Sequence, residues 1–474
     1  MERQLMQTET KNRKSGFYIE VTCPGCGSGL ELNEDFFVLK CDHCGSVHRV
    51  VMPDVPTAYF VPAKIDRREA RFSIDRYLKK NDLPLTASGM ALKQVYYPYW
   101  KVDAILFKLR NKAYERVVVA ESEYNDPVSV THERTEINLT PYIATCAAGS
   151  YFDGVPASIG MRAEYIRMLP YSVENLQEDF DSLPIVTTWE DVRADLKTKM
   201  GIISDVDPAS FGKNVTELFH PKASLVYFPF LVFESYTQGG FNRYVVDGVS
   251  GRVLDHVRQL DTDRQADYPE SPDIEFGALS VEHHRCPNCG LDLPPEQSWV
   301  YICHNCQQLV VIGGNDGIVD QVFRATGSDL PGDRAFPFWA FTIPDEDARR
   351  VKAMFGGVHN SNQLVIPAFK TRNFDAMYRL ARRISPALPR LEMEAVENFD
   401  DSYDPVRISL DEALMLADVI IYRQSYSSPR RAQESAATFA PRGVKLIYVP
   451  FHLENYFYVD SLLNAVTFEK SLAR

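Results

Sequence analysis

The chain has 474 residues, of which 45% are hydrophobic and 24% are charged. These are the proportions of an ordinary globular protein, and they exclude collagen-like and disordered chains. The length allows about three to five domains. The formal net charge of −13 argues against broad, sequence-independent binding of nucleic acid, which depends on many Lys and Arg residues, although a local basic patch could still provide it.

Hydropathy gives no sign of a membrane protein. No stretch reaches the ~20 apolar residues of a membrane helix, and the first ten residues lack the apolar core of a signal peptide. We therefore expect a cytoplasmic location, where thiols stay reduced and paired cysteines bind metal rather than form disulfides. Peripheral association with a membrane is an alternative.

Two cysteine quartets are the most specific motif. The first consists of Cys23, Cys26, Cys41 and Cys44, and the second of Cys286, Cys289, Cys303 and Cys306. A Cys-x-x-Cys step lets two thiolates reach one zinc ion at about 2.3 Å, and two such knuckles complete a tetrahedron. We predict two structural Zn²⁺ ions, since four sulfur ligands leave no open position for water or substrate.

Other uses of these cysteines fit less well. A redox pair needs one exposed Cys-x-x-Cys of low pKa rather than four in matched quartets. A rubredoxin-type iron site uses the same knuckles, usually with a longer insert. His43 and His304 lie inside the knuckles, where a full thiolate set leaves them no vacancy, and His283 and His284 are expected at the surface. Cys146 is expected to be a small buried residue.

Local residues predict the knuckle geometry. Gly27, Gly45 and Gly290 directly follow a second cysteine, where the turn favours positive φ. Gln307 takes this position in the fourth knuckle, which we therefore expect to be less regular. Apolar alternation between the knuckles, as in 30–39, predicts a β-hairpin there.

An apolar run around a proline recurs along the chain. Its copies are 95–100, 226–231, 364–369 and 447–452. Since proline lacks an N–H group, each run suits a strand at a sheet edge or bulge. If the two halves of the chain are copies, Pro98 matches Pro367 and Pro229 matches Pro450.

Helix starts and hairpins complete the repeat. Acidic first turns predict helices that begin within 64–70, 342–348 and 407–413, with a weaker counterpart at 169–174 and a capping pattern at 188–191. The first helix should bury Ala70, Phe72, Ile74 and Leu78. Asp followed by Gly or Asn predicts β-hairpins at 244–253 and 457–466.

Together these patterns predict an α+β fold that is internally duplicated. Each half has a zinc ribbon, made of β-hairpin knuckles, followed by two small α/β units with mainly antiparallel strands. The predicted segments are a zinc ribbon at 18–52, α/β units at 57–135 and 136–258, a linker at 259–279, a second zinc ribbon at 280–313, and α/β units at 333–395 and 404–474. The extra length near 110–165 should project from the first half as added strands or loops and bind a partner.

Several of these motifs resemble a known family. The ribbon cysteines, Pro62, Lys64-Ile65, Glu69-Ala70, Tyr97–Trp100 and the hairpin at 247–253 resemble those of largely uncharacterised bacterial and archaeal proteins. These proteins begin with a transcription-factor-IIB-like zinc ribbon, followed by P-F-K-I…E-A and Y-x-P-F-W units. The resemblance implies a non-enzymatic accessory role, cytoplasmic or membrane-associated.

The function classes follow from what the sequence contains. It has no phosphate-binding loop, nucleophile elbow or HExxH motif. We expect a non-enzymatic scaffold or assembly adaptor that binds protein partners. One alternative is a nucleic-acid-binding or transcription accessory factor, and a second is an enzyme with an unrecognised site. The basic residues available to a nucleic acid are Arg67, Arg68, Arg71, Arg76, Lys79 and Lys80, or Arg379, Arg382 and Arg383.

Overall fold

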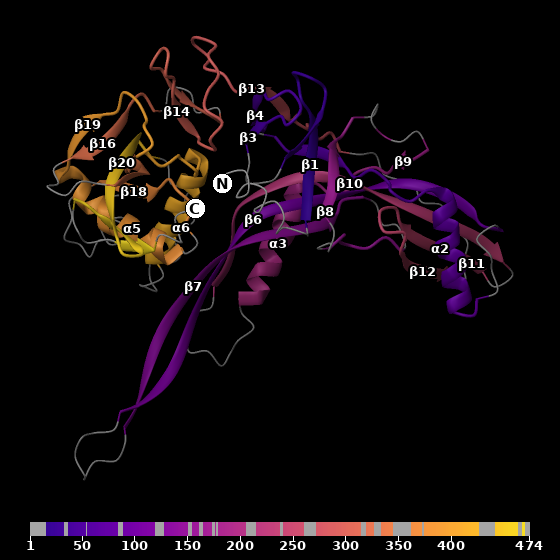
Figure 1. Ribbon diagram of the computed structural model, residues 1–474. Coiled ribbons are helices and arrows are strands. Elements are labelled where there is room, and N and C mark those ends of the chain that lie inside the picture. The colour runs from indigo at the N-terminus through magenta and orange to yellow at the C-terminus, as the bar shows by residue number, and fades with distance from the viewer. Residues whose placement is uncertain are drawn as a thin grey trace. The chain divides into compact units, whose positions relative to one another are not determined.

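A computed structural model gives the fold of the chain (Figure 1). The residues that it describes are 16–32, 37–53, 55–83, 89–118, 128–149, 154–160, 165–172, 176, 179–204, 215–237, 240–259, 272–313, 319–326, 333–344, 362–371, 374–425, 441–462 and 467–469. Most of the predicted linker at 259–279 and the helix predicted to begin within 342–348 lie outside these residues. Across the described part of the chain, no helix combines the length and apolar character needed to cross a membrane.

The fold is mixed α+β and divides into two compact units. Unit 1 comprises Met1–Asp35 and Met52–Val281, and unit 2 comprises Phe36–Val51 and Glu282–Arg474. Each unit contains a mainly antiparallel sheet with helices packed on it.

Unit 1 is built on a ten-stranded sheet. Its strands are β1 (Gly16–Thr22), β2 (Gly29–Leu32), β5 (Thr57–Phe60), β6 (Ala91–Val118), β7 (Val128–Ala147), β8 (Tyr165–Pro170), β9 (Asp181–Ser182), β10 (Val215–Thr237), β11 (Gly240–Asp247) and β12 (Val253–Gln259). Its described helices are α2 (Arg67–Lys80) and α3 (Trp189–Ser204).

Unit 2 is built on a seven-stranded sheet. Its strands are β16 (Val322–Thr326), β17 (Arg334–Thr342), β18 (Gln363–Pro367), β19 (Glu392–Ala395), β20 (Gly443–Glu454), β21 (Phe457–Asp460) and β22 (Thr467–Glu469). Its described helices are α5 (Phe374–Ala387), the short 3₁₀ helix η3 (Leu388–Arg390) and α6 (Leu410–Ser425). The cysteine regions add β3 (Val38–Lys40), β4 (Val47–Val51), β13 (Ser280–His283), β14 (Val300–Ile302) and β15 (Leu309–Val311).

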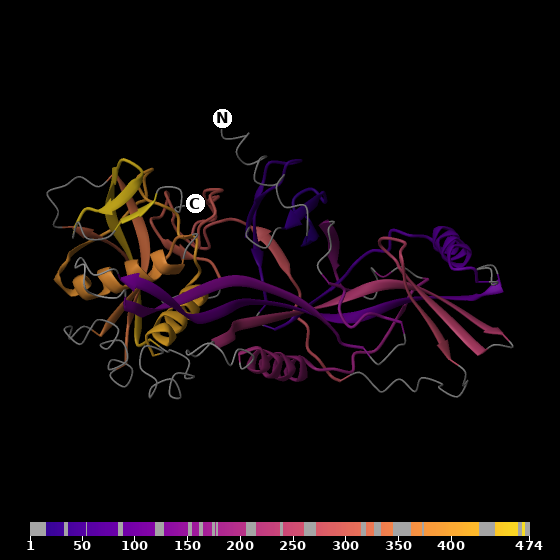
Figure 2. The same ribbon diagram turned by 90° about the horizontal axis from the view of Figure 1, so that it is seen from below.

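The two helices of unit 1 cover different parts of its sheet. The apolar side of α2 packs on β10 and β11, and α3 packs on β6 and β10, as Figures 1 and 2 show. Successive residues of a strand alternate between faces, so Tyr96 and Trp100 of β6 pack toward α3, while Tyr97 and Tyr99 belong to the core on the other face. The core therefore occupies both sides of the sheet.

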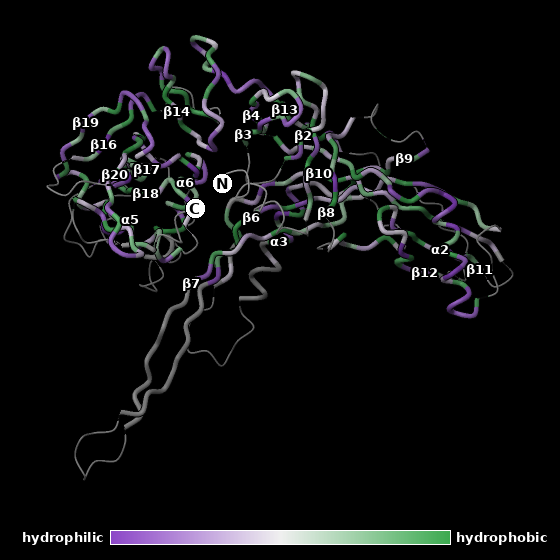
Figure 3. Tube along the Cα trace, viewed as in Figure 1, coloured by the Kyte–Doolittle hydropathy of each residue, from purple (hydrophilic) through white to green (hydrophobic). Residues whose placement is uncertain are grey.

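The start of α2 follows from local chemistry. Asp66 caps the helix by accepting a bond from the Glu69 N–H, and the Glu69 carboxylate accepts one from the Asp66 N–H. The hydrophilic and hydrophobic colours of Figure 3 alternate along α2, as an amphipathic helix requires. The predicted burial of Ala70, Ile74 and Leu78 is confirmed. Phe72 is not buried: it is 62% exposed, because its position falls outside the three-to-four-residue spacing of the buried stripe.

In unit 1, Pro229 lies at the point where β10 changes from one partner strand to another. β10 pairs in parallel with β5 as far as Tyr227 and antiparallel with β11 from Phe230 onward. Pro229 lies between these positions, and its carbonyl accepts a hydrogen bond from the Gly248 N–H at 2.9 Å. The residue that has no N–H thus lies where no partner needs one. The prediction of an edge position was wrong, since β6 also flanks β10 here.

Pro450 has the same setting in unit 2. β20 pairs in parallel with β16 as far as Tyr448 and antiparallel with β21 from Phe451 onward. The Pro450 carbonyl accepts a bond from the Ser461 N–H, again at 2.9 Å. The strand order around Pro229 and Pro450 is therefore the same.

A second pair of prolines, Pro98 and Pro337, also lies where a strand gains a new partner strand. In β6, Pro98 lies just before the pairing with β7 that starts at Tyr99, and its carbonyl accepts from the Ala148 N–H at 2.9 Å. In β17, Pro337 lies just before the pairing with β18, and its carbonyl accepts from the Ala368 N–H at 2.9 Å.

These pairings correct one predicted match. Pro98 is opposite Tyr227, and Pro337 is opposite Tyr448 at the corresponding position of unit 2. Pro98 thus corresponds to Pro337, and its predicted match with Pro367 is wrong. The six-residue runs are too short to show which strand of unit 2 is equivalent. The aromatic-Pro-aromatic-Trp order of 336–339 is in fact closer to that of 97–100.

One tryptophan in each unit joins the sheet to a helix start. The indole N–H of Trp100 donates to the Thr187 carbonyl at 2.8 Å, and that of Trp339 donates to the Ile408 carbonyl at 2.9 Å. Each carbonyl lies two residues before the first residue of a helix, α3 or α6. Thr188 and Ser409 then cap these helices by accepting bonds from Asp191 N–H and Glu412 N–H. The first of these caps confirms the capping pattern predicted at 188–191.

The extra length of the first half includes a long antiparallel pair of strands. β6 and β7 pair without a register shift from Tyr99 opposite Ala147 to Val118 opposite Val128. β10 accompanies β6 only as far as Leu109. The remaining residues, 110–118 and 128–136, form a two-stranded extension of unit 1 that Figure 1 shows, and we call it the β6–β7 arm.

Candidate metal centres

Each Cys-x-x-Cys step lies in a tight turn. β1 and β2 pair on either side of the 23–26 turn, β3 and β4 on either side of 41–44, and β14 and β15 on either side of 303–306. A single bridge between Arg285 and Asp292 flanks 286–289. The predicted hairpin between the knuckles is therefore wrong, because each knuckle is itself the turn between paired strands.

Backbone hydrogen bonds give all four turns one geometry. The carbonyl of the first cysteine accepts a bond from the N–H of the residue after the second cysteine, at 2.8–2.9 Å. That residue has positive φ in every case: +77° at Gly27 and Gly45, +73° at Gly290 and +59° at Gln307. The expectation of a less regular fourth knuckle is wrong, since Gln307 adopts the left-handed conformation at an energetic cost that glycine avoids.

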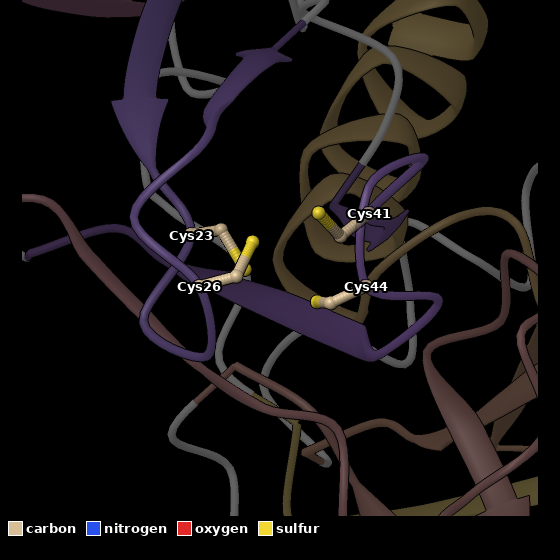
Figure 4. A group of neighbouring side chains, drawn as sticks. All are labelled: Cys23, Cys26, Cys41 and Cys44. Carbon is tan, nitrogen blue, oxygen red and sulfur yellow. The ribbon is translucent and has the colours of Figure 1, made fainter.

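The first quartet brings its sulfur atoms together. One sulfur from each of Cys23, Cys26, Cys41 and Cys44 lies within 4.8 Å of the others, and Figure 4 shows the two knuckles directing them toward a common centre. Cys23 and Cys41 are buried, whereas Cys26 and Cys44 are exposed. The grouping predicted from the spacing is therefore present.

Hydroxyl groups support the exposed thiols of this quartet. The Ser28 Oγ lies 3.1 Å from the Cys26 sulfur, and the Ser46 Oγ lies 2.8 Å from the Cys44 sulfur. Ser46 also contacts the Nε2 of His48 at 2.7 Å. Burial is the main cause that lowers the pKa of His48, and the electrostatic effect of the neighbouring His283 lowers it further. A neutral His48 that donates from Nε2 to Ser46 allows the serine hydroxyl to donate to the Cys44 thiolate.

The second quartet has the same arrangement. The sulfurs of Cys286, Cys289, Cys303 and Cys306 also lie within 4.8 Å of one another. Two of the sulfur–sulfur distances are 3.6 Å (Cys286 to Cys306) and 3.5 Å (Cys289 to Cys303). These are far longer than the ~2.05 Å of a disulfide. A tetrahedral ion with ~2.3 Å bonds to sulfur separates its ligands by about 3.8 Å, so these two distances are near those expected in a four-sulfur metal site.

Backbone donors favour thiolates at the more exposed positions. A bond from the Leu291 backbone lowers the pKa of Cys289 to about 6, and one from the Gln308 backbone lowers that of Cys306. Burial raises the pKa of Cys286 to about 11. A buried thiol of this kind gives up its proton when a cation compensates the charge, and this set of donors suits a dication.

Residues outside the knuckles connect the 41–44 knuckle and the second quartet to the rest of unit 2. The ring of Phe37 stacks on Trp299, with centroids 3.9 Å apart. The Gln297 side chain accepts from the N–H groups of Phe37 (3.2 Å) and Val38 (3.1 Å) and donates to the Val38 carbonyl. The Ser298 hydroxyl accepts from the Val406 N–H at 3.1 Å, just before α6.

The structure corrects the expectation for one histidine. His284, predicted at the surface, is fully buried, and its Nε2 contacts the Pro294 carbonyl at 3.1 Å. Burial lowers its pKa to about 4, so it is neutral at pH 7. Its neighbour His283 is exposed. Sequence reasoning missed His284, His48 and Gln297, because no local pattern distinguishes a supporting residue from a surface polar one.

The remaining candidates lie away from the quartets or at their surface. His43 and His304 are exposed on the knuckle turns. Cys146 is half-buried on β7 beside the core that α3 covers. The basic residues named on α2 and α5 are all exposed: Arg67, Arg68, Arg71, Arg76, Lys79, Lys80, Arg379, Arg382 and Arg383.

The eight cysteines thus form two sets of four sulfur donors, each able to hold a metal ion. Searches among protein families, curated proteins and solved structures find no match to this chain.

Proposed function

We propose that the protein is a zinc-binding, non-enzymatic scaffold whose two Zn(Cys)4 centres are structural. The observation that carries the zinc assignment is the pair of four-sulfur clusters, each with all four sulfurs within 4.8 Å. Four sulfurs fill a tetrahedral ion completely, which leaves it no position at which to activate water or polarise a substrate. The metal then acts by fixing the knuckles.

Zinc content tests this proposal. Native mass spectrometry of protein purified without added metal should give the chain mass plus two zinc ions. A chelator should remove both, and each loss should be accompanied by proton uptake by the cysteines, because the ligands bind as thiolates. Two iron ions, or no more than one zinc in fully folded protein, would contradict the assignment.

Internal duplication is the second part of the proposal. Corresponding prolines lie at the same changes of partner strand, and corresponding tryptophans bind the carbonyls before α3 and α6. Such agreement in hydrogen bonds supports descent of both α/β regions from one ancestral unit. Two related units offer separate surfaces for partners, which suits an adaptor.

The scaffold role draws support from aromatic side chains at equivalent hairpin ends. Tyr236 near the β10–β11 turn is 73% exposed, and at the β20–β21 turn Tyr456 is 80% and Phe457 43% exposed. Exposed aromatics of this kind are typical of binding surfaces.

Crosslinking tests the scaffold role. A photoreactive residue at position 456 should crosslink to a specific protein in the native host, whereas one at exposed Lys80 on α2 should not. The purified partner should then bind the wild-type chain and lose at least tenfold in affinity for Tyr456→Ser and Phe457→Ser together. Unchanged affinity would contradict a scaffold that works through this turn.

A further inference from the structure

Arginine occupies every exposed position of α5. These positions are Arg379, Arg382 and Arg383, and Arg390 is also exposed in η3, which follows. Residues three and four apart lie on one side of a helix, so the first three form a continuous stripe. We call these four residues the α5 arginine face. The chain as a whole has a net charge of −13, so this face is a local exception.

Buried neighbours on both flanks hold α5 in place. Its Met377 packs in the core cluster that contains Trp339, and its Leu380 packs in the cluster that contains Phe338. Trp339 and Phe338 are successive residues of β17 and therefore lie on opposite faces of the sheet. The Ser385 hydroxyl also accepts a hydrogen bond from an N–H group of β18 at 2.8 Å. These contacts fix the helix, so its exposed side presents the arginines in one direction.

No ion pair neutralises the α5 arginine face within the part of the chain that the structure describes. The Arg379 Nε donates to the Asp375 carbonyl, a neutral acceptor, at 3.3 Å. Arg382, Arg383 and Arg390 form no ion pair with another described residue. Like charges three and four residues apart destabilise a helix. The stripe is therefore unfavourable for α5 unless an anion binds it.

The length and composition of the face suit a row of phosphates. From Arg379 to Arg390 the helix rises by about 16 Å at ~1.5 Å per residue. No acidic residue lies between these two arginines, and the next one in sequence is Glu392 on β19. Double-stranded DNA carries one negative charge per ~1.7 Å of its axis, so about ten phosphates lie along this length. A guanidinium binds phosphate through two parallel N–H bonds, a geometry that lysine lacks.

Exposed side chains of α5 and η3 distinguish a nucleic acid from other anionic partners. In these two helices no large apolar side chain is exposed. A protein interface has an apolar core and a membrane-binding helix inserts apolar side chains, whereas an interface with DNA is polar and strongly basic. Single strands stack on exposed aromatic rings, but the aromatic residues of α5, Phe374 and Tyr378, are not exposed. The composition therefore favours a duplex.

We propose that the α5 arginine face binds the phosphate backbone of double-stranded DNA. A guanidinium donates hydrogen bonds but cannot accept them, so the face lacks the acceptors that would favour the 2′-hydroxyl groups of an RNA duplex. Because the contacts are made to phosphates, binding does not depend on base sequence. The inference goes beyond the zinc and scaffold proposals and depends on neither.

Salt dependence of DNA binding tests it. The full-length protein is titrated into a labelled 30-base-pair DNA duplex over a range of salt concentrations, with fluorescence anisotropy as the readout. The variant Arg379→Gln, Arg382→Gln, Arg383→Gln and Arg390→Gln should bind at least tenfold more weakly at low salt. Its plot of log affinity against log salt should be shallower by about 3 to 4, since each lost phosphate contact removes about 0.9.

A matched control separates the face from net charge. Arg68→Gln, Arg71→Gln, Lys79→Gln and Lys80→Gln change the charge by the same amount at exposed sites on α2. This control should bind DNA within about twofold of wild type and keep its salt slope. Equal losses in both variants, or none in the α5 variant, would overturn the proposal.

Competing anions give further outcomes. An RNA duplex or a single DNA strand of equal length that binds more tightly than the DNA duplex would overturn the proposal. So would phosphatidylserine vesicles that bind through the face while DNA does not. Circular dichroism and zinc content check that each variant is folded. If the four-residue variant fails this check, Arg382→Gln with Arg383→Gln should make the salt slope shallower by about 2. An unchanged slope in that folded variant would equally overturn the proposal.

Discussion

Phe37 and Trp299 stack with their ring centroids 3.9 Å apart and their planes at 20°. Each residue directly precedes the first strand of a knuckle hairpin, β3 or β14, so equivalent positions of the two cysteine regions contact each other within unit 2. Trp299 also packs against the main core of the unit. We therefore expect loss of either ring to weaken the second quartet.

A double-mutant cycle measures this contact. Phe37→Ala and Trp299→Ala should each destabilise the protein, Trp299→Ala by about 2–3 kcal/mol because it also opens the core. The coupling energy should be about 1 kcal/mol, as for other buried aromatic pairs. Denaturant unfolding of the four proteins gives the value. Additive effects within about 0.3 kcal/mol would mean that the stacking contributes nothing of its own.

Removal of one zinc ligand should act on one centre. Cys289→Ser should lower the zinc content from two ions to one and expose the 282–313 region to protease, because ligation energy supplies folding energy in such sites. Cys146→Ser is the matched control, since Cys146 belongs to neither quartet, and it should keep both ions. Loss of zinc from the control, or unchanged protease resistance at 282–313, would contradict a structural role.

The left-handed Gln307 offers a gain in stability. Gln307→Gly should stabilise the protein by about 1 kcal/mol, because glycine adopts a φ of +59° without the steric cost that a Cβ imposes. Gly45→Gln, the reciprocal change at the equivalent position of another knuckle, should destabilise by a similar amount. Thermal unfolding of the zinc-loaded proteins checks both. A Gln307→Gly variant that unfolds earlier than wild type would show that the glutamine side chain stabilises the turn.

Local features of the fold could be predicted from the sequence where the chemistry is local. Both quartets are set by Cys-x-x-Cys spacing, and the starts of α2 and α6 are set by capping residues within four positions of each other. The hairpin at 244–253 followed from Asp247, whose carboxylate accepts from the Val249 and Ser250 N–H groups. In each of these cases neighbouring residues make the deciding contact.

The remaining features depend on contacts between distant residues. Pro98 and Pro337 correspond because of the strands opposite them, which a run of six letters does not reveal. The burial of His284 depends on packing, including the contact of its ring with Tyr301. The helix predicted to begin within 342–348 lies outside the described residues and stays a prediction.

A buried ion network in unit 1 should make stability depend on pH. Glu234 is 6% exposed and contacts Lys93 at 2.8 Å and Arg243 at 2.7 Å. Burial raises the pKa of Glu234, but the bonds from Lys93 and Arg243 together outweigh it and lower the pKa below its ordinary value of 4.5. The network therefore stabilises the fold above pH 4.5, and its contribution disappears as the pH falls through the lowered pKa.

Glu234→Gln tests this dependence. The variant should be less stable by about 2–3 kcal/mol at pH 7, because the charge-assisted bonds are lost. The difference from wild type should shrink below pH 4.5. Asp255→Asn, at an exposed position on β12, is the control and should change stability by less than about 0.5 kcal/mol. A constant difference across the pH range would contradict the assignment to the ionised Glu234.

The proposed duplication predicts equal costs at equivalent sites. Trp100→Phe removes the bond to the Thr187 carbonyl, and Trp339→Phe removes the bond to the Ile408 carbonyl. Both tryptophans are fully buried, so each change should cost about 2 kcal/mol by leaving a carbonyl without its donor and a small space in the core. The double variant should show the sum, since the two sites lie in different units. Tyr236→Phe, at an exposed position, should cost nothing measurable. A cost at Trp339 without one at Trp100, measured by denaturant unfolding and hydrogen exchange, would show that the common hydrogen-bond pattern does not reflect a common unit of stability.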